Sequence, residues 1–566
     1  MLFANFDMFD LPSLSSRFRF SLTINSMVCG GMGQFGNHGR AVQELLSRGL
    51  QVVSLYRKLF AQCRGYGLRS ARLEWVAQML FVSSSLAANL CKRNMMPAFH
   101  PAKCGKGGRI MREWNGSCKY YSSMCKRFDF IHVTGTKGKG STCAWTDALL
   151  RSHFRSNGIP GKVGLFTSPH LTSERERIRT DFVPVSEAIF AERFFHVWNT
   201  LLQDANGDEE KMPRYFQLLT LLSVDIFNHT GTKVGIYEVN IGGRWDSTNC
   251  WDDTVVCGFN TIGLDHTPKL GRTIPEIARN KAGIMKPGCL AFSVPQTPEV
   301  REQLEKESNL VGCPLVFTND RPSRVPDTDR PELLLEPVRN NFALAIELAD
   351  AYLKSCLNSR LSDEDIIGAV HIYDWPGRFQ MVEDPGTRTR FYLDSPANSL
   401  SIPVSLDWFI TQVQHHASVA LSTPSKPRQP TRILIFGHDS THRDASTVAR
   451  AIANHCYELK FAFDKIILTS HKHPVNGLVL FGKQRASETM GVWEEMYGSP
   501  VVSFAESVED ALESCSPIND LGSHMLIAGH TDLVSSALPV LITGVKLKLN
   551  KLTSYNGTSG GSGARL

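Results

Sequence analysis

A short glycine-rich stretch carries the residue types that hold a polyphosphate. Residues 130–134 form an apolar run with the length of a buried strand, and helical spacing follows from Cys143 onward. Glycines let backbone amides approach phosphate oxygens closely, and a helix N-terminus adds unpaired N–H groups and a favourable dipole. Lys139 would reach the β- and γ-phosphates of a nucleotide, and the Ser141 hydroxyl would lie near Mg²⁺. The stretch reads Gly135, Thr136, Lys137, Gly138, Lys139, Gly140 and Ser141.

The spacing of this stretch differs from the common G-x-x-x-x-G-K-[ST] pattern. Val133 stands where that pattern has its first glycine, so the loop is a shorter form. A glycine-rich turn alone is also consistent with a tight connection between two elements. The strand before it and the helix after it favour a nucleotide-binding loop.

The size and composition describe an ordinary globular protein. The 566 residues are enough for two or three domains with large cores. Apolar residues make up 42% and charged residues 20%, and 61 basic residues stand against 55 acidic ones. This balance argues against nucleic acid as a partner and is compatible with a small anionic substrate. The 14 cysteines include no C-x-x-C pair, which favours reduced, buried thiols in a cytosolic protein.

We predict no membrane-spanning segment and a cytoplasmic location. The most apolar stretch, residues 76–90, contains Gln78 and three serines and is too short to cross a bilayer. Residues 1–27 include two arginines and several serines, but Asp7 and Asp10 argue against a mitochondrial presequence. A mitochondrial location is therefore the weaker alternative.

From about residue 111 onward, strand-like runs alternate with helical ones, which indicates parallel sheets with crossover helices. Before that point only residues 41–50 suggest a helix. After the loop, strands are expected from residue 162 into a Ser-Pro turn and at 234–239 and 254–262, and helices at 216–227, 274–284 and 341–353. A second α/β unit is expected to have strands at 391–394, 432–436, 465–469 and 524–528.

Polar side chains follow several of these strands, where doubly wound sheets bind their ligands. Ser168, Glu238 and His266 offer a hydroxyl, a carboxylate and an imidazole, a set that could hold a second Mg²⁺ beside Lys139. Each also has an ordinary interpretation: Ser168 as a turn residue before proline and His266 as a loop histidine. Glu238 is harder to explain away, because a carboxylate inside an apolar strand must be paired or bound to metal. Lys281 would usually lie on a solvated helix face, although the Ala-Gly-Ile that follows suggests close packing.

Five motifs in this chain resemble folylpolyglutamate synthases of the eukaryotic type. That family belongs to the Mur-ligase-like ATP-dependent amide ligases. The similarity extends over about residues 111–545 and is densest up to 380. The motifs are the loop at 135–141, Phe-Thr-Ser-Pro-His-Leu at 166–171, Gly-Leu-Asp-His at 263–266, Lys-Ala-Gly-Ile-Met-Lys-Pro-Gly at 281–288 and Pro-Gly-Arg-Phe at 376–379.

The resemblance implies an α/β fold: a P-loop-containing, Mur-ligase-like central domain with a parallel sheet, and a smaller Rossmann-like α/β C-terminal domain. We place an N-terminal extension at 1–100, the ATP-binding central domain at 101–378, a linker at 379–390, the C-terminal domain at 391–548 and a flexible tail at 549–566. A monomer with small-molecule substrates, and without nucleic acid, is expected.

The resemblance also implies an activity: ATP-dependent addition of L-glutamate to the γ-carboxyl group of tetrahydrofolate polyglutamates, through an acyl phosphate. Mg²⁺ would be held through Ser141 and, at a second position, through Ser168, Glu238 and His266; a monovalent cation such as K⁺ is a further candidate. Lys281 matches a lysine that is carbamylated in some relatives. Catalytic roles fall to Lys139, Glu238, His266 and Lys281, and nucleotide contacts beyond the loop to Asn341, Arg378 and Asp394. The pair at 443–444 resembles the second domain's Arg-Asp pair.

The chain departs from the family pattern in the second unit and at a few positions before it, which leaves two other functions open. One is a ligase of the same class with a different acid or amine, and the other is a catalytically silent nucleotide-binding protein. A catalytically silent protein is disfavoured, because the chain retains Lys139, Ser141, Ser168, Glu238, His266 and Lys281. The departures are Asp-Ser-Pro-Ala-Asn at 394–398 for Asp-Gly-Ala-His-Thr, Pro337-Val338 for His-Gln, Gly-His-Thr-Asp-Leu-Val at 529–534 for Gly-Ser-Leu-His-Leu-Val, and the unusual Asn240 and Arg244 around the segment 242–249.

Overall fold

The computed structural model describes most of the chain from residue 127 onward. The expected helix at 41–50, the extension at 1–100 and Arg443 lie outside the described residues, and so does the end of the expected tail from 557. The described ranges are 127–208, 212–328, 330–384, 389–396, 400–420, 430–439, 444–472, 479–497, 501–515 and 523–556.

The first sheet has the strand order β4-β3-β2-β5-β1-β6-β7-β8. The six strands from β2 to β8 in this order run parallel, and β3 and β4 complete one edge in antiparallel pairing. The expected parallel sheet with crossover helices is therefore present. The strands are β1 (Asp129–Thr134), β2 (Lys162–Phe166), β3 (Ile178–Thr180), β4 (Val183–Pro184), β5 (Thr232–Glu238), β6 (Val256–Phe259), β7 (Leu290–Ser293) and β8 (Leu315–Phe317).

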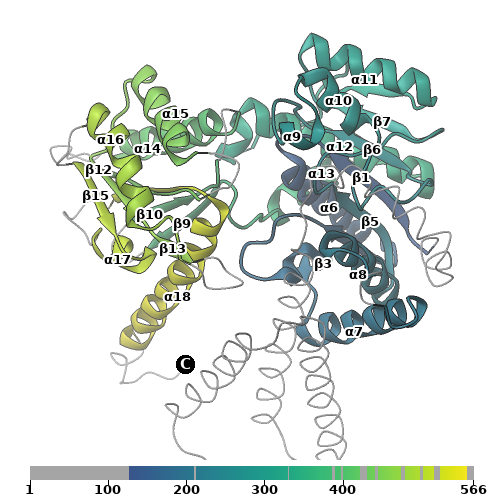
Figure 1. The fold of residues 1–566 in the computed structure, drawn as a ribbon, viewed down its shortest axis with the longest axis horizontal. Coiled ribbons are helices and arrows are strands. Elements are labelled where there is room, and N and C mark those ends of the chain that lie inside the picture. The colour runs from purple at the N-terminus through teal and green to yellow at the C-terminus, as the bar shows by residue number, and fades with distance from the viewer. Residues whose placement is uncertain are drawn as a thin grey trace, which may run out of the picture. The chain divides into compact units, whose positions relative to one another are not determined.

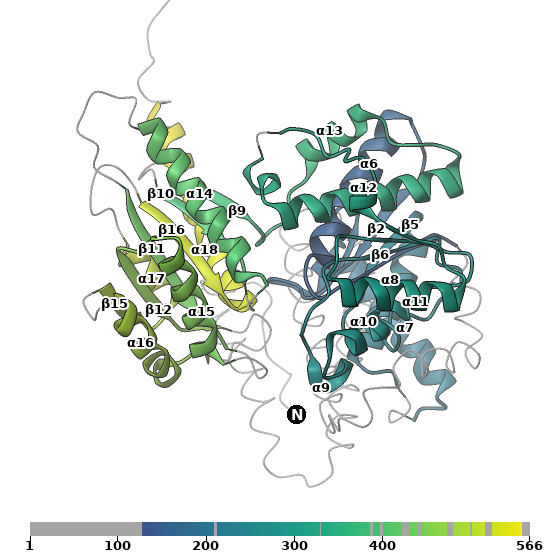
Figure 2. The same ribbon diagram turned by 90° about the horizontal axis from the view of Figure 1, so that it is seen from above.

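Helices cover both faces of this sheet, because its strands are apolar on both sides. α6, α12 and α13 lie on one face, and α7, α8, α10 and α11 lie on the other (Figures 1 and 2). The bounds are α6 (Lys139–Ser156), α7 (Glu187–Asp204), α8 (Tyr215–Thr230), α9 (Thr267–Leu270), α10 (Ile274–Ala282), α11 (Pro298–Val311), α12 (Glu336–Leu357) and α13 (Asp363–Ile372), with short 3₁₀ turns at Glu174–Arg177, Thr318–Asp320 and Pro331–Leu334.

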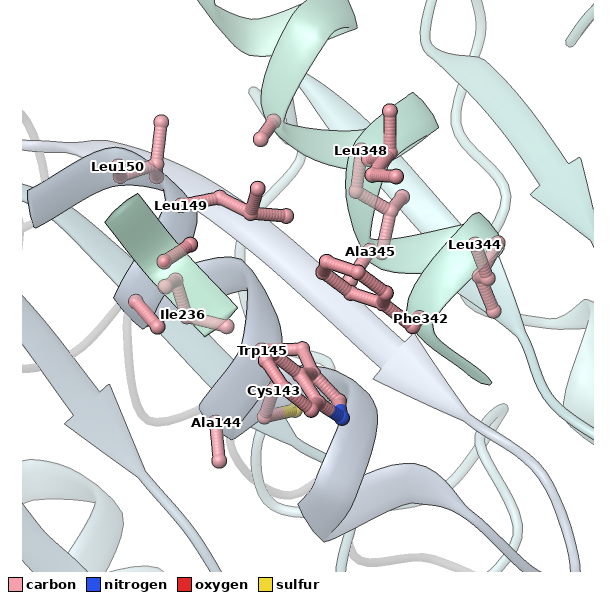
Figure 3. Close-up of a cluster of buried hydrophobic side chains, with 14 of the residues drawn as sticks. Cys143, Ala144, Trp145, Leu149, Leu150, Ile236, Phe342, Leu344, Ala345 and Leu348 are labelled. Atoms are coloured by element: carbon pink, nitrogen blue, oxygen red, sulfur yellow. The ribbon is translucent and has the colours of Figure 1, made fainter. Parts of the chain in front are cut away.

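The α6–α12 contact forms the centre of the first core. The ring centroids of Trp145 and Phe342 lie 4.3 Å apart, and the Tyr373 ring stacks on the indole with centroids 3.4 Å apart. Figure 3 shows the rings of Trp145 and Phe342 between α6 and α12, beside Leu149 and Ala345. Because α6 begins at the glycine-rich loop, this packing fixes where the loop ends.

The second sheet has the order β15-β12-β11-β16-β10-β9, parallel except for β9. The four expected strands of the second unit are present as β10, β11, β12 and β16. The strands are β9 (Gln380–Asp384), β10 (Thr389–Leu393), β11 (Thr431–Gly437), β12 (Lys465–Thr469), β15 (Val502–Ala505) and β16 (Ser523–Gly529), with a separate pair β13 (His471–Lys472) and β14 (Val479–Leu480); the helices are α14 (Ile402–Ala420), α15 (Ala445–Glu458), α16 (Lys483–Tyr497), α17 (Val508–Glu513) and α18 (Thr531–Asn556).

Several element bounds differ from the sequence expectation for local reasons. The segment expected as a linker at 379–390 contains β9, which pairs with β10 as an antiparallel edge strand. The helix expected at 341–353 begins earlier, at Glu336, because a proline at the first turn is compatible with a helix start. α18 continues to Asn556, beyond the expected start of the tail at 549.

We expect the core contact between α6 and α12 to dominate the stability of the first sheet. Phe342→Ala removes a fully buried ring, so the free energy of unfolding measured by urea denaturation should fall by about 3–5 kcal/mol. Leu310→Ala is the control, because Leu310 is 72% exposed on α11 and should change the value by less than about 0.5 kcal/mol. Equal effects of the two substitutions would contradict this description of the core.

Candidate active site

The glycine-rich loop joins β1 to α6, as the sequence predicts. α6 begins at Lys139, and its N-cap residue, Gly138, has a φ of 87° and makes no side-chain capping bond. The first amides of a helix have no partner within the helix. Without a capping side chain, the amides at this end are directed to whatever anion lies beyond the loop.

Two glycines let the loop pass close to neighbouring segments. A Cβ atom on Gly135 would lie 2.6 Å from the Cβ of Asn260, and one on Gly138 would overlap the side-chain amide of Asn341. Both glycines also have positive φ values, of 152° and 87°, which residues with a side chain rarely adopt. The glycine types at these positions are therefore required by sterics as well as by phosphate access.

A buried amide network explains these close approaches. The Asn260 Nδ2 donates to the Thr142 hydroxyl at 2.7 Å and to the Asn341 Oδ1 at 2.8 Å. The Thr142 hydroxyl donates in turn to the backbone carbonyl of Asn341 at 3.2 Å. The network joins the end of β6 to α6 and α12. Asn341 was predicted from the family resemblance, whereas Asn260 was missed; its signal is a polar residue directly after an apolar strand.

Residues that follow β6 hold the first part of the loop in place. The backbone amides of Thr136 and Lys137 both donate to the Thr261 carbonyl, at 2.8 and 3.3 Å. The Thr136 hydroxyl accepts from the Gly263 amide and donates to its carbonyl, each at 3.1 Å. These two predicted loop residues therefore use their amides to fix the loop, and the first-turn amides of α6 are left for an anion.

Glu238 ends β5 directly beside the loop. Its carboxylate lies 3.9 Å from the Lys139 Nζ and accepts a hydrogen bond from the Ser168 amide at 2.9 Å. Burial raises the pKa of this carboxyl group, and the charge of Lys139 and the Ser168 bond oppose the rise. A Cβ on Gly140 would approach the carboxylate to 3.3 Å. Of the predicted set Lys139, Ser168, Glu238 and His266, the first three thus lie together, with the Ser168 contact made by its backbone.

Arg177 adds positive charge near this carboxylate and was not predicted. It is buried, its Nε donates to the His170 Nδ1 at 2.8 Å, and its charge helps to lower the pKa of Glu238. A glutamate near several cations in a poorly solvated site stays ionised more readily than burial alone would allow.

Lys281 is buried on α10 and does not lie on a solvated face. Its Nζ donates to the Gly135 carbonyl at 2.7 Å. Burial lowers the pKa of this amine well below its usual range, and the nearby charge of Lys139 lowers it further. The hydrogen bond to Gly135 braces the phosphate loop from the side of α10.

Ser141 and His266 are the remaining predicted metal ligands. Ser141 lies in the first turn of α6. His266 is the N-cap residue of α9, with a φ of 51°, and its amide donates to the Asp265 carboxylate at 3.0 Å. The four strands β2, β5, β1 and β6 are adjacent and parallel, so their carboxyl ends meet at one edge of the sheet. The place of His266 at that edge follows from this strand order.

Arg378 and Asp394, predicted separately from the resemblance, lie together. The Arg378 Nη1 donates to the Ser395 hydroxyl at 2.6 Å and lies 3.9 Å from the Asp394 carboxylate. Burial raises the pKa of Asp394, and Arg378 opposes the rise. Farther along the chain, Asp444 caps α15 by accepting the Thr447 amide at 2.9 Å.

The arrangement is suited to a polyphosphate beside a divalent cation. A helix N-terminus and Lys139 meet the anion, and a buried carboxylate supplies the hard oxygen ligand that Mg²⁺ or Mn²⁺ prefers.

None of the helices in the described ranges combines the length and the hydropathy needed to cross a bilayer.

Comparisons with known proteins give a consistent result. The folylpolyglutamate synthase of Neurospora crassa is 32% identical over 453 residues, which cover 76% of this chain and 84% of the relative. The folylpolyglutamate synthase of Candida albicans is 31% identical over 478 residues, covering 76% and 88%. No protein-family model matches the chain.

Solved structures match the fold. The Mycobacterium tuberculosis folylpolyglutamate synthase complexed with ADP aligns with a TM-score of 0.62 at 20% identity, covering 81% of this chain and 98% of that one. The Yersinia pestis bifunctional folylpolyglutamate synthase/dihydrofolate synthase complexed with AMPPNP and a Mn ion aligns with a TM-score of 0.58 at 22% identity, with the same coverage. The two-sheet α/β architecture expected from the sequence is therefore confirmed.

The loop geometry predicts a selective effect of one glycine substitution. Gly138→Ala places a methyl group against Asn341 at a φ of 87°, so the affinity for a non-hydrolysable ATP analogue, measured by calorimetry, should fall by about 100-fold or more. Gly158→Ala is the matched control: Gly158 also has a positive φ, of 60°, but nothing lies within 4 Å of its added Cβ. The control should lose about 1 kcal/mol of stability and keep its affinity. Equal affinities of both variants would contradict the proposed loop contacts.

Proposed function

Because the chain belongs to the folylpolyglutamate synthase family, we propose that it joins L-glutamate to the γ-carboxyl group of folates and their polyglutamates, driven by ATP. The fungal relatives that carry this name are about one-third identical over most of both chains. The single observation that carries the proposal is the buried Glu238 carboxylate beside Lys139 at the glycine-rich loop. Neither a silent scaffold nor a simple tight turn requires a buried carboxylate at that point.

In the proposed complex, the ATP phosphates lie against the start of α6. Lys139 offsets negative charge on the β- and γ-phosphates, and the amides of the first turn bind the phosphate oxygens. Asn341 contacts the loop directly and would act by holding Gly138 in place. Arg378 and Asp394 are proposed as further nucleotide contacts, on the basis of the family resemblance.

The residues around Glu238 fit a divalent cation. The carboxylate is buried, faces Lys139 and the helix start, and has its pKa raised by desolvation. A cation would relieve that desolvation by pairing with the charged form. Glu238, Ser141, Ser168 and His266 are the proposed ligands. When bound, Mg²⁺ would withdraw charge from the phosphates and so assist phosphoryl transfer.

The proposed reaction has two chemical steps. The γ-carboxylate of the folate attacks the γ-phosphorus of ATP, which forms an acyl phosphate and releases ADP. The amine of glutamate then attacks the acyl carbon, and phosphate leaves as the amide bond forms. This chain's part in the first step is electrostatic: Lys139 balances the charge on the group in transfer, and the loop fixes its orientation. The acyl phosphate must also be shielded from water while it awaits the amine.

One observation supports a second candidate function, with a different pair of substrates. Ser395 stands where the family pattern has glycine, and its hydroxyl and carbonyl both bind Arg378. The altered segment therefore touches a proposed nucleotide contact rather than lying on an unused surface. A ligase that keeps the same chemistry but takes a different acid or amine is the second candidate.

The activity predicts ADP formation that depends on both co-substrates. Purified protein with ATP and Mg²⁺ should release ADP only when tetrahydrofolate and L-glutamate are both present, and mass spectrometry should find a folate extended by glutamate. Lys139→Ala should lower kcat by at least about 10²–10³-fold, the range for loss of one preorganised electrostatic group. Lys354→Ala removes an exposed lysine of α12 and should leave kcat unchanged.

Other outcomes separate the alternatives. Turnover with another carboxylic acid, but not with folates, would replace the folate assignment by the second candidate. Tight ATP binding without turnover across a panel of acids and amines would favour a silent nucleotide-binding protein. Substantial activity of Lys139→Ala would show that the phosphate-loop assignment is wrong.

A further inference from the structure

Three cysteines from separate parts of the sequence meet inside the first unit. Cys257 lies in β6, Cys289 directly precedes β7, and Cys313 lies two residues before β8. Their sulfur atoms are all within 4.8 Å of one another, and all three residues are buried. Sequence spacing gives no hint of this group, because each cysteine lies in or just before a different strand.

The strand pairing explains why the sulfurs converge. β6, β7 and β8 are adjacent and parallel, with Val256 paired to Leu290 and Ala291 paired to Leu315. The three cysteines therefore lie at the amino ends of neighbouring strands. The phosphate loop follows the carboxyl end of β1 in the same sheet, so the cysteine cluster belongs to the opposite edge and is separate from the candidate active site.

The geometry points to a binding site for one soft metal ion, held by the thiolates of Cys257, Cys289 and Cys313. Thiolates that each lie about 2.3 Å from a shared ion are about 4 Å apart, which agrees with sulfurs grouped within 4.8 Å. Small movements of side chains already in place would complete such a site. The proposal is independent of the ligase activity.

The number and type of ligands select the ion. Thiolates favour Cu(I), zinc and iron–sulfur clusters over hard cations such as Mg²⁺. Structural zinc almost always takes four protein ligands, and the group found in the described residues offers three. Apolar side chains pack around the three cysteines, among them Phe259, Ile284 and Val300. Three sulfurs in an apolar setting suit three-coordinate Cu(I) best.

A bound ion would cross-link the starts of β6, β7 and β8. Binding to the folded state alone stabilises it in proportion to the logarithm of ligand concentration over Kd. Reduced, full-length protein should therefore bind one equivalent of Cu(I) at this site, in competition with the chromophoric chelator bicinchoninate under anaerobic conditions. Its thermal unfolding midpoint should rise on binding.

Matched variants identify the site. Cys313→Ala should lower the Cu(I) affinity by at least about 100-fold and abolish the rise in unfolding midpoint. Cys456→Ala is the control, because it removes a fully buried cysteine of α15, a helix that packs against the second sheet, and should change neither result. Copper bound equally well by native protein and Cys313→Ala, or not bound by native protein, would overturn the proposal.

A spectroscopic measurement keeps the test valid if Cys313→Ala fails to fold. X-ray absorption of native protein with one equivalent of Cu(I) should show three sulfur neighbours and no nitrogen or oxygen neighbour. A parallel titration with Zn²⁺ tests whether the site prefers zinc to Cu(I). Zinc bound through the three sulfurs with a nitrogen or oxygen as fourth ligand, in preference to Cu(I), would overturn the three-coordinate assignment.

Discussion

The burial of one carboxylate at the carboxyl edge of a parallel sheet is the constraint on which this structure depends. Glu238 is 4% exposed, and an ionised carboxylate in such a place is unfavourable unless charges and hydrogen bonds compensate it. Lys139, the Ser168 amide and, more weakly, Arg177 contribute to that compensation. The partners come from the loop after β1, the turn after β2 and the segment that follows it. Satisfying one side chain therefore fixes three segments around the position proposed for the phosphates.

Rigidity around the loop has a second source in the contacts behind it. Asn260, Asn341 and Thr142 connect the end of β6, α12 and α6 through buried hydrogen bonds, while Lys281 braces Gly135 from α10. A loop held from several sides loses little further freedom when it binds a ligand. Such preorganisation is what electrostatic catalysis of phosphoryl transfer requires, because the charges must already be in place when the transferring group arrives.

The sequence predicts the part of the site that follows from local pattern. The strand–loop–helix order, the carboxylate at the end of β5 and the meeting of Lys139, Ser168 and Glu238 all follow from parallel strands sharing one edge. The Asn260 network and the cysteine cluster could not be found in this way, since their members are brought together by strand order and register. β9 was expected to be a linker, because its five residues lie between a Trp-Pro-Gly-Arg turn and a Pro-Gly segment. Only its pairing with β10 makes it a strand.

The central claim is that Glu238 and the loop form one site for a nucleotide and a divalent cation. Electron paramagnetic resonance of Mn²⁺ with the ATP analogue AMPPNP tests it most directly, by counting the bound ion in native protein, Glu238→Gln and Glu307→Gln. Glu307 is the matched control, because it is also buried but pairs with Arg244 at 2.6 Å on α11. The account predicts that Glu238→Gln binds Mn²⁺ at least about 10–100-fold more weakly, while the control binds as native protein does. Equal Mn²⁺ affinity in all three proteins would contradict it.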